Sequence, residues 1–476
     1  MARQSKIIAT LGPSTDGYEA TSRLIKAGVD VVRLNMSHSD HKVLRERVKV
    51  VKKVATEIDR PIAILVDLQG PKIRVASFKN GSVNLKKGTI FTLVVGMTKL
   101  GDDTCVGVTY ANLVKDCKKG DMILLDDGRI TMKVQSISGK KVKCKVVDGG
   151  VLSNRKGLNK KGGGISAASI TTKDKEDIRA AAEIGADYLA VSFVRSADDM
   201  HLTRKLLTKA GGDAGIIAKI ETSEAVATYD HLLAIVKASD GAMLARGDLG
   251  VEIGETKLIG MQKDLIAMCR ANDKISIIAT QMMETMIDNP SPTRAEVSDV
   301  ANAVLDGSDA VMLSGETAAG KHPHLVVETM ARICEGADSY HGGFAQVAPK
   351  NINVESNDNI SRKIARAAVR TATTTDKVVA LVSLTESGSS ALYMSRMNTN
   401  IPIYGFSRHR KTLRKMALYR DVVPVYFKQP PENVGLAVLD FMREKKLMKR
   451  KDRMVLTSGM THLVSGGSNT MRVLEA

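Results

Sequence analysis

The chain has 476 residues, of which 43% are hydrophobic and 26% charged, and no segment has a strongly biased composition. A chain of this kind holds roughly two to four globular domains, and its composition excludes a disordered or fibrous protein. The longest apolar runs, such as Ile62–Val66, are far shorter than the about 18 residues that cross a membrane. The first residues lack the apolar core of a signal peptide, so we expect a cytoplasmic protein with no membrane partner.

The net charge of +18 is unevenly distributed. Residues 71–165 carry about +12 and residues 351–476 about +11, so the remainder is mildly acidic. A strong positive charge is typical of proteins that bind nucleic acid or another polyanion. Proteins that bind single strands add aromatic stacking platforms, but this chain has no tryptophan and few aromatic residues. We therefore expect small phosphorylated ligands and no nucleic acid.

Short runs rich in Val and Ile recur between residues 6 and 316, and each predicts a buried strand. The expected strands are Lys6–Gly12, Val29–Ser37, Ile62–Leu68, Tyr188–Val194, Gly215–Glu221, Gly241–Gly250, Ile275–Thr280 and Ser308–Glu316. Segments with apolar residues three and four apart lie between them and predict amphipathic helices. The expected helices are Thr15–Ala27, Asp40–Glu57, Lys173–Ile184, Ala197–Ala210, Glu224–Lys237, Thr256–Asn272, Arg294–Leu305 and His322–Ala337. Eight strand-helix units of this kind would close into an α/β fold of the TIM type, a (β/α)8 barrel.

The third unit is interrupted by an insertion with the pattern of a β domain. Val142, Cys144 and Val146 alternate with lysines, as in half-exposed strands. Later in the chain, a second strand-helix series predicts a separate α/β domain with an open sheet. Its expected strands are Val378–Leu384, Ile401–Ser407, Val422–Phe427, Met454–Ser458 and Thr470–Leu474. We therefore divide the chain into a barrel (residues 1–70 and 168–344), a β-barrel-like lid domain (71–167) and a C-terminal α/β domain (345–476).

Polar residues gather at the ends of the expected barrel strands, where barrel enzymes build their sites. Glu221 and Asp248 end neighbouring strands, and their carboxylates suit Mg²⁺ or Mn²⁺. The alternative is a pair of structural salt bridges at the rim. Lys219 shares a face with Glu221 because side chains alternate along a strand. It could form a Schiff base or stabilise a transferring phosphoryl group, and a neighbouring cation favours the second role.

Two arginines are candidate ligands for a phosphate or a carboxylate. Arg33 ends the second expected strand, and Arg74 follows the third. A guanidinium binds either group through two hydrogen bonds. An exposed arginine without a functional role is the alternative for each.

Seven short segments, in order along the chain, are more specific than any single residue. They are Lys6–Ser14 (KIIATLGPS), Arg33–His38 (RLNMSH), Ile217–Glu221 (IAKIE), Ala245–Glu252 (ARGDLGVE), Pro292–Glu296 (PTRAE), Asp299–Asp306 (DVANAVLD) and Met312–Thr317 (MLSGET). Together they resemble the pyruvate kinase family over essentially the whole chain. The resemblance implies a barrel interrupted by a β lid and followed by a regulatory α/β domain, in a homotetramer. It also implies a phosphotransferase of glycolysis that transfers phosphoryl from phosphoenolpyruvate to ADP to give pyruvate and ATP.

The resemblance assigns roles to individual residues. Mg²⁺, or Mn²⁺, would lie on Glu221 and Asp248, while Lys219 and Arg33 would neutralise the transferring phosphoryl group. The carboxylate of the substrate would be held with Asp248 by the backbone at Ala245 and Gly247 and by the Thr280 hydroxyl, and Thr280 would lie where the enolate is protonated. The nucleotide would be bound by Asn35, His38, Arg74 and Lys156, the last of them a lid lysine whose closure excludes water.

A departure from the family pattern concerns the monovalent cation. Asn35, Ser37, Asp67 and the Leu68 carbonyl could form its pocket. Potassium-dependent members carry Thr, Lys and Glu around this strand end, whereas this chain reads Asp67-Leu-Gln-Gly-Pro-Lys72-Ile-Arg74. Lys72 would place a permanent positive charge where K⁺ acts, so we expect no potassium requirement; the alternative is that Lys72 points to solvent.

The last domain contains a loop that leads from an expected strand into a helix. Its hydroxyls and amides, at Thr385, Ser387, Gly388, Ser389 and Ser390, could bind the phosphate of an effector. The alternative is an ordinary capped turn. Members that respond to fructose 1,6-bisphosphate commonly add a tryptophan contact, which this chain lacks. The resemblance thus favours a sugar monophosphate or AMP as allosteric activator.

Two other functions remain open at this point. A metal-dependent lyase or aldolase acting on a keto acid would also need Glu221, Asp248 and Arg33, but not the lid or Lys156. A basic RNA-binding scaffold would bind weakly and in a salt-sensitive manner.

Overall fold

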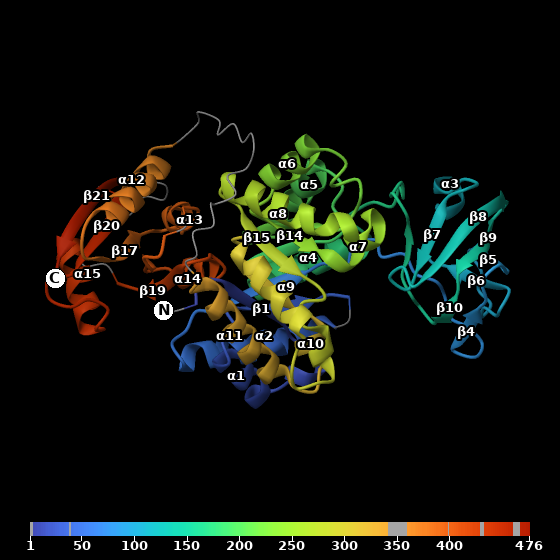
Figure 1. Cartoon of the computed structure of the whole chain (residues 1–476), viewed down its shortest axis with the longest axis horizontal. Helices are drawn as coiled ribbons and strands as arrows, with labels where there is room; N and C mark the ends of the chain where they lie inside the picture. Colours follow the sequence, from blue (N-terminus) through green and yellow to red (C-terminus); the bar gives the residue numbers. More distant parts are fainter. Residues whose placement is uncertain (1–2, 38–39, 341–358, 398, 429–432, 460–466) are drawn as a thin grey trace.

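The computed structural model describes residues 3–37, 40–340, 359–397, 399–428, 433–459 and 467–476. The chain folds into three parts arranged in a row, with the barrel in the middle and the lid and the C-terminal part at opposite ends of it (Figure 1). The expected fold class is confirmed, because parallel strands close into a barrel and a separate α/β sheet follows. The division near residues 70, 168 and 345 stays a prediction, and its last boundary lies outside the described residues.

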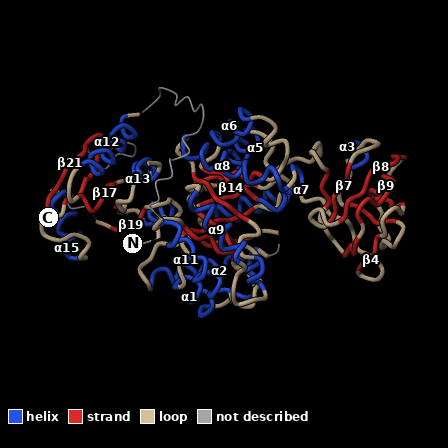
Figure 2. The backbone as a smooth tube through the Cα atoms, viewed as in Figure 1, coloured by secondary structure: helices blue, strands red, loops and turns tan. Residues whose placement is uncertain are grey.

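Eight parallel strands form the barrel, in the order β1-β16-β15-β14-β13-β12-β3-β2. The strands are β1 (Lys6–Thr10), β2 (Val31–Asn35), β3 (Ala63–Asp67), β12 (Tyr188–Val191), β13 (Gly215–Ile220), β14 (Gly241–Ala245), β15 (Ile275–Ala279) and β16 (Ala310–Leu313). Nearly every strand residue is buried, because one face fills the barrel interior and the other packs against the helices. Figure 2 shows the helices wrapped around these strands.

The outer layer consists of eight longer helices and four short ones among the described barrel residues. The longer helices are α1 (Tyr18–Lys26), α2 (His41–Glu57), α4 (Thr172–Ile184), α5 (Ala197–Lys209), α6 (Tyr229–Ala238), α8 (Glu255–Ala271), α9 (Arg294–Leu305) and α11 (Pro323–Asp338). The short ones are η1 (Pro13–Thr15), α7 (Arg246–Ile253), η2 (Glu284–Ile287) and α10 (Gly315–Ala318). Local sequence fixes several ends. Reciprocal capping boxes begin α4 at Thr171 and α9 at Thr293, and Gly185 ends α4 with a φ of 68°.

Several expected elements were misplaced at their ends; for example, the strand expected over Ser308–Glu316 ends at Leu313, and helix α10 begins at Gly315. The strand expected over Gly241–Gly250 ends at Ala245, and helix α7 begins at Arg246. Arg246 and Asp248 interrupt the apolar run, but the apolar Leu249 and Val251 follow, so the hydrophobic pattern alone did not separate the strand from the helix. The helix expected from Glu224 begins at Tyr229, where the Thr228 hydroxyl accepts a hydrogen bond from the His231 amide.

The lid is inserted between β3 and α4 and has its own core, around Phe91, Leu93, Val134 and Cys144. Its strands form a six-stranded sheet in the order β11-β7-β8-β9-β5-β6 and a two-stranded sheet of β10 and β4. Its elements are β4 (Ser82–Leu85), β5 (Ile90–Val95), β6 (Cys105–Val108), α3 (Leu113–Asp116), β7 (Met122–Leu125), β8 (Ile130–Ser138), β9 (Lys141–Asp148), β10 (Gly150–Ser153) and β11 (Leu158–Lys160). The lid joins the barrel next to the carboxyl ends of the strands.

The C-terminal part is an open sheet in the order β19-β18-β17-β20-β21, in which only the pairing of β20 with β21 is antiparallel among the described strands. Its elements are α12 (Ile360–Thr374), β17 (Val378–Leu384), α13 (Ser389–Ser395), β18 (Ile403–Ser407), α14 (Arg410–Met416), β19 (Val422–Tyr426), α15 (Val434–Glu444), β20 (Arg453–Gly459) and β21 (Ser468–Glu475). One face of this sheet packs in a cluster that is continuous with the barrel interior, where Ile217 and Met243 belong to the same core as Met394 and Leu413.

Four aspartates form a regular set at the amino ends of the barrel strands, and we call them the aspartate ring. Each directly precedes a strand, and each accepts a hydrogen bond from the amide of the second residue of the preceding barrel strand. The pairs are Asp30 with Ile7 (2.9 Å), Asp187 with Ile64 (2.9 Å), Asp240 with Ile216 (2.8 Å) and Asp309 with Ser276 (2.9 Å). The ring thus satisfies backbone donors that the barrel ladder leaves free at this end.

Each carboxylate of the aspartate ring also binds an arginine. Asp30 binds Arg3 and Arg60, and Asp240 binds Arg204, all from the barrel part of the chain. Asp187 binds Arg414 and Asp309 binds Arg396, both from the C-terminal part. Charged contacts at two ring positions therefore attach the C-terminal part to the amino end of the barrel.

Candidate active site

The carboxyl ends of the strands bring four of the predicted side chains into contact. Arg33 lies in β2, Asp67 ends β3, Lys219 lies in β13 and Glu221 directly follows β13. The Arg33 Nε donates to Asp67 Oδ2 at 2.7 Å, and Lys219 Nζ lies 3.3 Å from Asp67 Oδ1 and 3.4 Å from Glu221 Oε2. Lys219 also donates to the hydroxyl of Ser192 at 2.6 Å. Two cations and two carboxylates thus share a buried site that faces the lid end of the barrel.

The charges of this group support one another. Burial by itself lowers the pKa of Lys219, but Asp67 and Glu221 outweigh burial, so the pKa lies above its ordinary value. Burial raises the pKa of Asp67, but Lys219 and Arg33 outweigh it, so the pKa lies below its ordinary value. The ammonium and the carboxylate are therefore both charged at neutral pH.

Glu221 has one oxygen without a hydrogen-bond partner. Its Oε1 accepts from the amide of Phe193 at 2.7 Å, whereas the buried Oε2 makes no hydrogen bond and has only the ion pair with Lys219 at 3.4 Å. Burial raises the pKa of Glu221 to about 7, with Lys219 lowering it and Asp248 raising it. A buried polar atom without a hydrogen bond is costly, and a cation beside Glu221 and Asp248 would satisfy the Oε2 atom.

The donor set fits magnesium. The two carboxylates offer hard oxygen ligands, and Mg²⁺ usually takes one or two carboxylates and completes its shell with water and substrate oxygens. Among the described residues there is no cluster of three or more His, Cys, Asp or Glu side chains that would form an all-protein cage. The chain thus offers a site for a cation that keeps room for a substrate.

Thr280 lies at the end of β15, opposite the first turn of α7. Its hydroxyl accepts from the amide of Gly247 at 2.7 Å and donates to the carbonyl of Ala279 at 2.6 Å. Ala245 is the last residue of β14, so Ala245, Gly247 and Asp248 lie around one short turn. The structure therefore brings together the groups expected to hold the substrate carboxylate, although the Gly247 amide is bonded to Thr280 here.

The groups expected to form a monovalent-cation pocket have protein partners. The Asn35 side-chain oxygen accepts from the Ser37 amide at 2.9 Å, and the Leu68 carbonyl accepts from Ser192 at 2.7 Å. Lys72 points into the site, because its Nζ lies 3.7 Å from Asp248 Oδ1 and its side chain is 29% exposed.

The residues expected to bind the nucleotide are not gathered in one place. Arg74 donates to the carbonyl of Arg155 at 2.9 Å, and Lys156 lies 2.8 Å from Asp126 Oδ1, so both make these contacts within the lid. Asn35 lies at the end of β2 in the barrel, and His38 lies outside the described residues.

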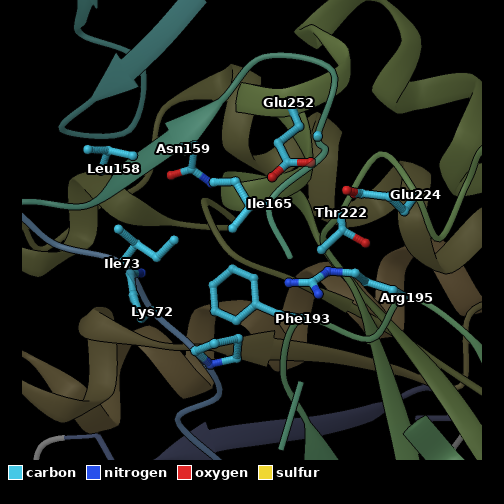
Figure 3. Close-up of a pocket in the computed structure, with 12 residues that line it drawn as sticks. Lys72, Ile73, Leu158, Asn159, Ile165, Phe193, Arg195, Thr222, Glu224 and Glu252 are labelled. Carbon is cyan, nitrogen blue, oxygen red and sulfur yellow. The ribbon is translucent and has the colours of Figure 1, made fainter. Parts of the chain in front are cut away.

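The two linkers of the lid meet the barrel around a small pocket (Figure 3). Ile73 from the first linker and Ile165 from the second lie around the ring of Phe193. The second linker contains Gly162–Gly164, with φ values of 78°, 74° and 82°, which only glycine adopts readily. The Gly164 amide donates to Glu224 at 2.5 Å. The Phe193 amide donates to Glu221, so the residue that the two linkers surround is bonded directly to the candidate metal ligand.

The loop expected to bind an effector is a tight turn in the C-terminal part. Thr385 Oγ1 accepts from the Gly388 amide at 2.8 Å, and Gly388 has a φ of 88°. The hydroxyls of Ser387 and Ser389 are 3.0 Å apart, and Ser390 Oγ lies 2.6 Å from Ser468 Oγ. The loop also contains Glu386, which pairs with Arg408 and His409.

Three contributors to these sites were absent from the expectations. Ser192 binds Lys219, Asp299 binds the buried guanidinium of Arg246, and Glu386 lies inside the effector loop. Ser192 lies in an expected barrel strand and Glu386 lies in the expected effector loop, so the sequence could have indicated both residues. The contact between Asp299 and Arg246 joins residues 53 apart, and nothing in the local pattern predicts it.

The fold and the charges at the strand ends define a class, a (β/α)8 barrel enzyme with an anion-binding site beneath a lid. Comparisons with known proteins identify the family. A model described as "Pyruvate kinase, barrel domain" matches residues 2–327, and one described as "Pyruvate kinase, alpha/beta domain" matches residues 362–474. The chain belongs to the pyruvate kinase family, a family of transferases.

Individual relatives are similar over nearly their full length. Pyruvate kinase II of Salmonella typhimurium is 47% identical, with 99% of this chain and 98% of that protein covered. The pyruvate kinase of Buchnera aphidicola subsp. Schizaphis graminum is 46% identical, with the same coverage. That of Thermotoga maritima is 37% identical, with 99% of both chains covered. No helix among the described residues is long and apolar enough to cross a membrane.

Proposed function

We propose that the chain transfers the phosphoryl group of phosphoenolpyruvate to ADP, and that the residues at the barrel rim carry out the reaction. The observation that supports this proposal best is the charged group around Lys219. Its ammonium lies within 3.4 Å of two carboxylates, and one of these has a buried oxygen without a hydrogen bond. This arrangement is charged, preorganised and incomplete without a cation and an anionic substrate.

The reaction breaks the bond between phosphorus and the enol oxygen and forms a bond between phosphorus and a terminal oxygen of ADP. Negative charge spreads over the phosphoryl oxygens during transfer. Lys219 and Arg33, both buried and both charged, neutralise it. A magnesium or manganese ion on Glu221 and Asp248 would supply positive charge to the substrate oxygens.

The second half of the reaction adds a proton to the enolate carbon and leaves pyruvate. Thr280 holds the position from which this proton reaches the carbon, through water. Its hydroxyl and the backbone around Gly247 also orient the substrate carboxylate. Asn35, His38, Arg74 and Lys156 bind ADP, the last two once the lid closes and water is excluded.

Initial rates of pyruvate formation test this reaction. With Mg²⁺ present, we expect pyruvate only when phosphoenolpyruvate and ADP are both supplied, and ATP formed in equal amount. Pyruvate from a keto acid without ADP would instead indicate a lyase or an aldolase. Binding of RNA with no turnover would indicate the scaffold function.

We also propose that the enzyme works without added potassium. Lys72 supports this proposal, because its ammonium lies 3.7 Å from Asp248 and faces the site rather than solvent. A fixed positive charge there assists the binding of anionic substrates as a monovalent cation would. If an ion is bound after all, Asn35, Ser37, Asp67 and the Leu68 carbonyl would hold it.

Regulation is the third part of the proposal. A phosphorylated metabolite, a sugar monophosphate or AMP, would bind the loop from Thr385 to Ser390 and activate the enzyme. The supporting observation is the turn itself, in which Ser387 and Ser389 lie together at the start of α13. The enzyme would act as a cytoplasmic homotetramer, and light scattering of the purified protein measures that state.

A further inference from the structure

Two consecutive residues at the active site adopt an unfavourable backbone conformation. Thr280 has a φ of 67° and Gln281 a φ of 55°, and neither is glycine. A positive φ is uncommon for any side chain and a genuine outlier for a β-branched one such as threonine. Conformations of this kind are strained and persist only where the surrounding structure enforces them.

The side chain of Arg246 supplies the enforcing contacts. Its guanidinium donates to the Thr280 carbonyl at 2.9 Å and to the Gln281 carbonyl at 3.3 Å. The same guanidinium binds both oxygens of Asp299, at 2.7 and 2.6 Å. The Arg246 side chain is only 5% exposed, so it is fixed between the carboxylate on one side and the two carbonyls on the other.

We propose that Arg246, held by Asp299, is a positioning residue that keeps Thr280 and Gln281 in the left-handed conformation and thereby places the Thr280 hydroxyl. That hydroxyl is held at 2.7 Å from the Gly247 amide, in the residue next to Arg246. Arg246 therefore fixes both sides of this contact: its backbone carries the turn of α7, and its side chain holds the end of β15.

Without the guanidinium, the two carbonyls lose charge-assisted hydrogen bonds, and the strained backbone relaxes toward negative φ. The Thr280 hydroxyl then leaves its position. A displacement of about 1 Å at a reacting centre costs on the order of 10²-fold in rate. The inference rests on the role proposed above for Thr280 in protonation of the enolate.

The first experiment measures that proton transfer directly. In D₂O with MgATP present, the methyl group of pyruvate loses a proton and gains a deuteron, and the loss of its proton NMR signal gives the rate. We expect Asp299→Asn to slow this exchange about 10- to 100-fold. The KM for phosphoenolpyruvate should rise, because the Thr280 hydroxyl also orients the substrate carboxylate. Single-turnover phosphoryl transfer at saturating phosphoenolpyruvate should change by less than about threefold, because Lys219 and Arg33 are untouched.

The second experiment separates positioning from general stability. Gln281 is exposed, and glycine adopts a positive φ without steric cost but raises the entropy of the unfolded chain. We expect Gln281→Gly, added to Asp299→Asn, to restore most of the exchange rate without a further fall in the melting temperature, because the strain that glycine relieves at a positive φ exceeds its entropy cost in the unfolded chain. If Arg246 and Asp299 served only to stabilise the fold, the exchange rate and the melting temperature would fall together. An exchange rate that is not restored in the double variant would therefore overturn the proposal.

Controls separate the possible failures. Asp30→Asn removes a buried aspartate from its arginines at the opposite end of the barrel, and exchange should stay within twofold of the original rate. If Thr280→Val exchanges normally, the role of Thr280 is wrong and the positioning role falls with it. If Thr280→Val is slow but Asp299→Asn is normal, only the positioning role of Arg246 is overturned.

Discussion

At the scale of single residues, the chemistry depends on how each charge is surrounded. Lys219 is buried, yet it stays charged because Asp67 and Glu221 outweigh the effect of burial on its pKa. The two carboxylates therefore keep Lys219 positively charged before the substrate binds, and this charge can then neutralise the transferring phosphoryl group. The charged state of Lys219 could not be predicted from the spacing of Lys219 and Glu221 alone, since Asp67 is far from both in the sequence.

The first prediction is that Lys219→Met lowers kcat by about 10²–10³-fold or more, because a preorganised charge on the transition state is lost. Steady-state rates and the melting temperature should be measured together. Lys175→Met changes an exposed lysine of α4 and should leave kcat unchanged. Wild-type turnover in the Lys219 variant would contradict its assignment.

The second prediction concerns the cation. Glu221→Gln and Asp248→Asn should each raise the Mg²⁺ concentration needed for half-maximal rate and lower that rate, because each removes an anionic oxygen ligand. The matched control is Glu252→Gln, a buried carboxyl whose oxygen already accepts from the Ser223 amide at 2.7 Å. If magnesium dependence is the same in all three variants, the cation binds elsewhere.

The third prediction is that the enzyme is active in tetramethylammonium buffer and that Lys72→Glu makes it dependent on K⁺. Removing the positive charge of Lys72 beside Asp248 leaves excess negative charge in the site, which a bound cation would then have to neutralise. Initial rates with and without about 100 mM KCl, at equal ionic strength, measure this. Lys161→Glu, at an exposed position in the other linker, controls for a general effect of charge. Strong stimulation of the unmutated enzyme by K⁺ would be the contrary result.

At the scale of elements, the strands and helices were predictable where the hydrophobic period was long and unbroken. All eight barrel strands and their helices lie where Val- and Ile-rich runs and amphipathic segments indicated. The end of β14 was not predictable, because Arg246 begins a helix for reasons that lie at Asp299 and Thr280, outside the local pattern. Tertiary contacts decided the boundary.

The fourth prediction concerns the turn before α13. Ser389→Ala with Ser390→Ala should raise the activator concentration needed for half-maximal activation several-fold and leave the basal rate unchanged, because hydroxyl donors to a phosphate are lost. Glucose 6-phosphate and AMP are suitable probes in the pyruvate assay. Thr374→Ala removes an exposed hydroxyl of α12 that bonds within its own helix and serves as the control. An unchanged activation constant in the double variant would place the effector elsewhere.

The fifth prediction concerns Asp421, just before β19 at the contact with the barrel. Burial raises the pKa of Asp421 to about 6, with Arg420 lowering it. A raised carboxyl pKa means that the folded protein binds the proton more tightly than the unfolded chain does. Its contribution to stability therefore falls as pH rises from about 4 to 6, and above that range the buried charge costs up to about 3 kcal/mol.

Asp421→Asn should accordingly raise the melting temperature at pH 8, and this gain should shrink as the pH approaches 4. Asp421 has a φ of 65°, which asparagine also tolerates, so any backbone gain is the same at every pH. Thermal unfolding from pH 4 to 8 separates the two effects. A gain that does not vary with pH would show that Asp421 is ionised without cost.

At the scale of the whole molecule, the order of the three parts was predictable but their attachment was not. The insertion after β3 and the second strand series are visible as changes of pattern along the chain. The contacts of Arg396 and Arg414 with the barrel join residues 87 and 227 apart, and both arginines look like ordinary surface residues in the sequence. Only the fold shows that they take part in a repeated arrangement.

The aspartate ring has a consequence for how such a molecule could be assembled from modules. At two ring positions the barrel provides its own arginines, and at the other two the C-terminal part provides equivalent ones. The charged part of the attachment is thus a substitution of partners at ring positions, and it adds to the apolar core that Met394 and Leu413 share with the barrel. A barrel cut free of the C-terminal part would expose two carboxylates without counterions, and it would need arginines supplied at Asp187 and Asp309. Conversely, a different domain grafted onto the same end of the barrel would need two suitably spaced arginines and an apolar face in place of Met394 and Leu413.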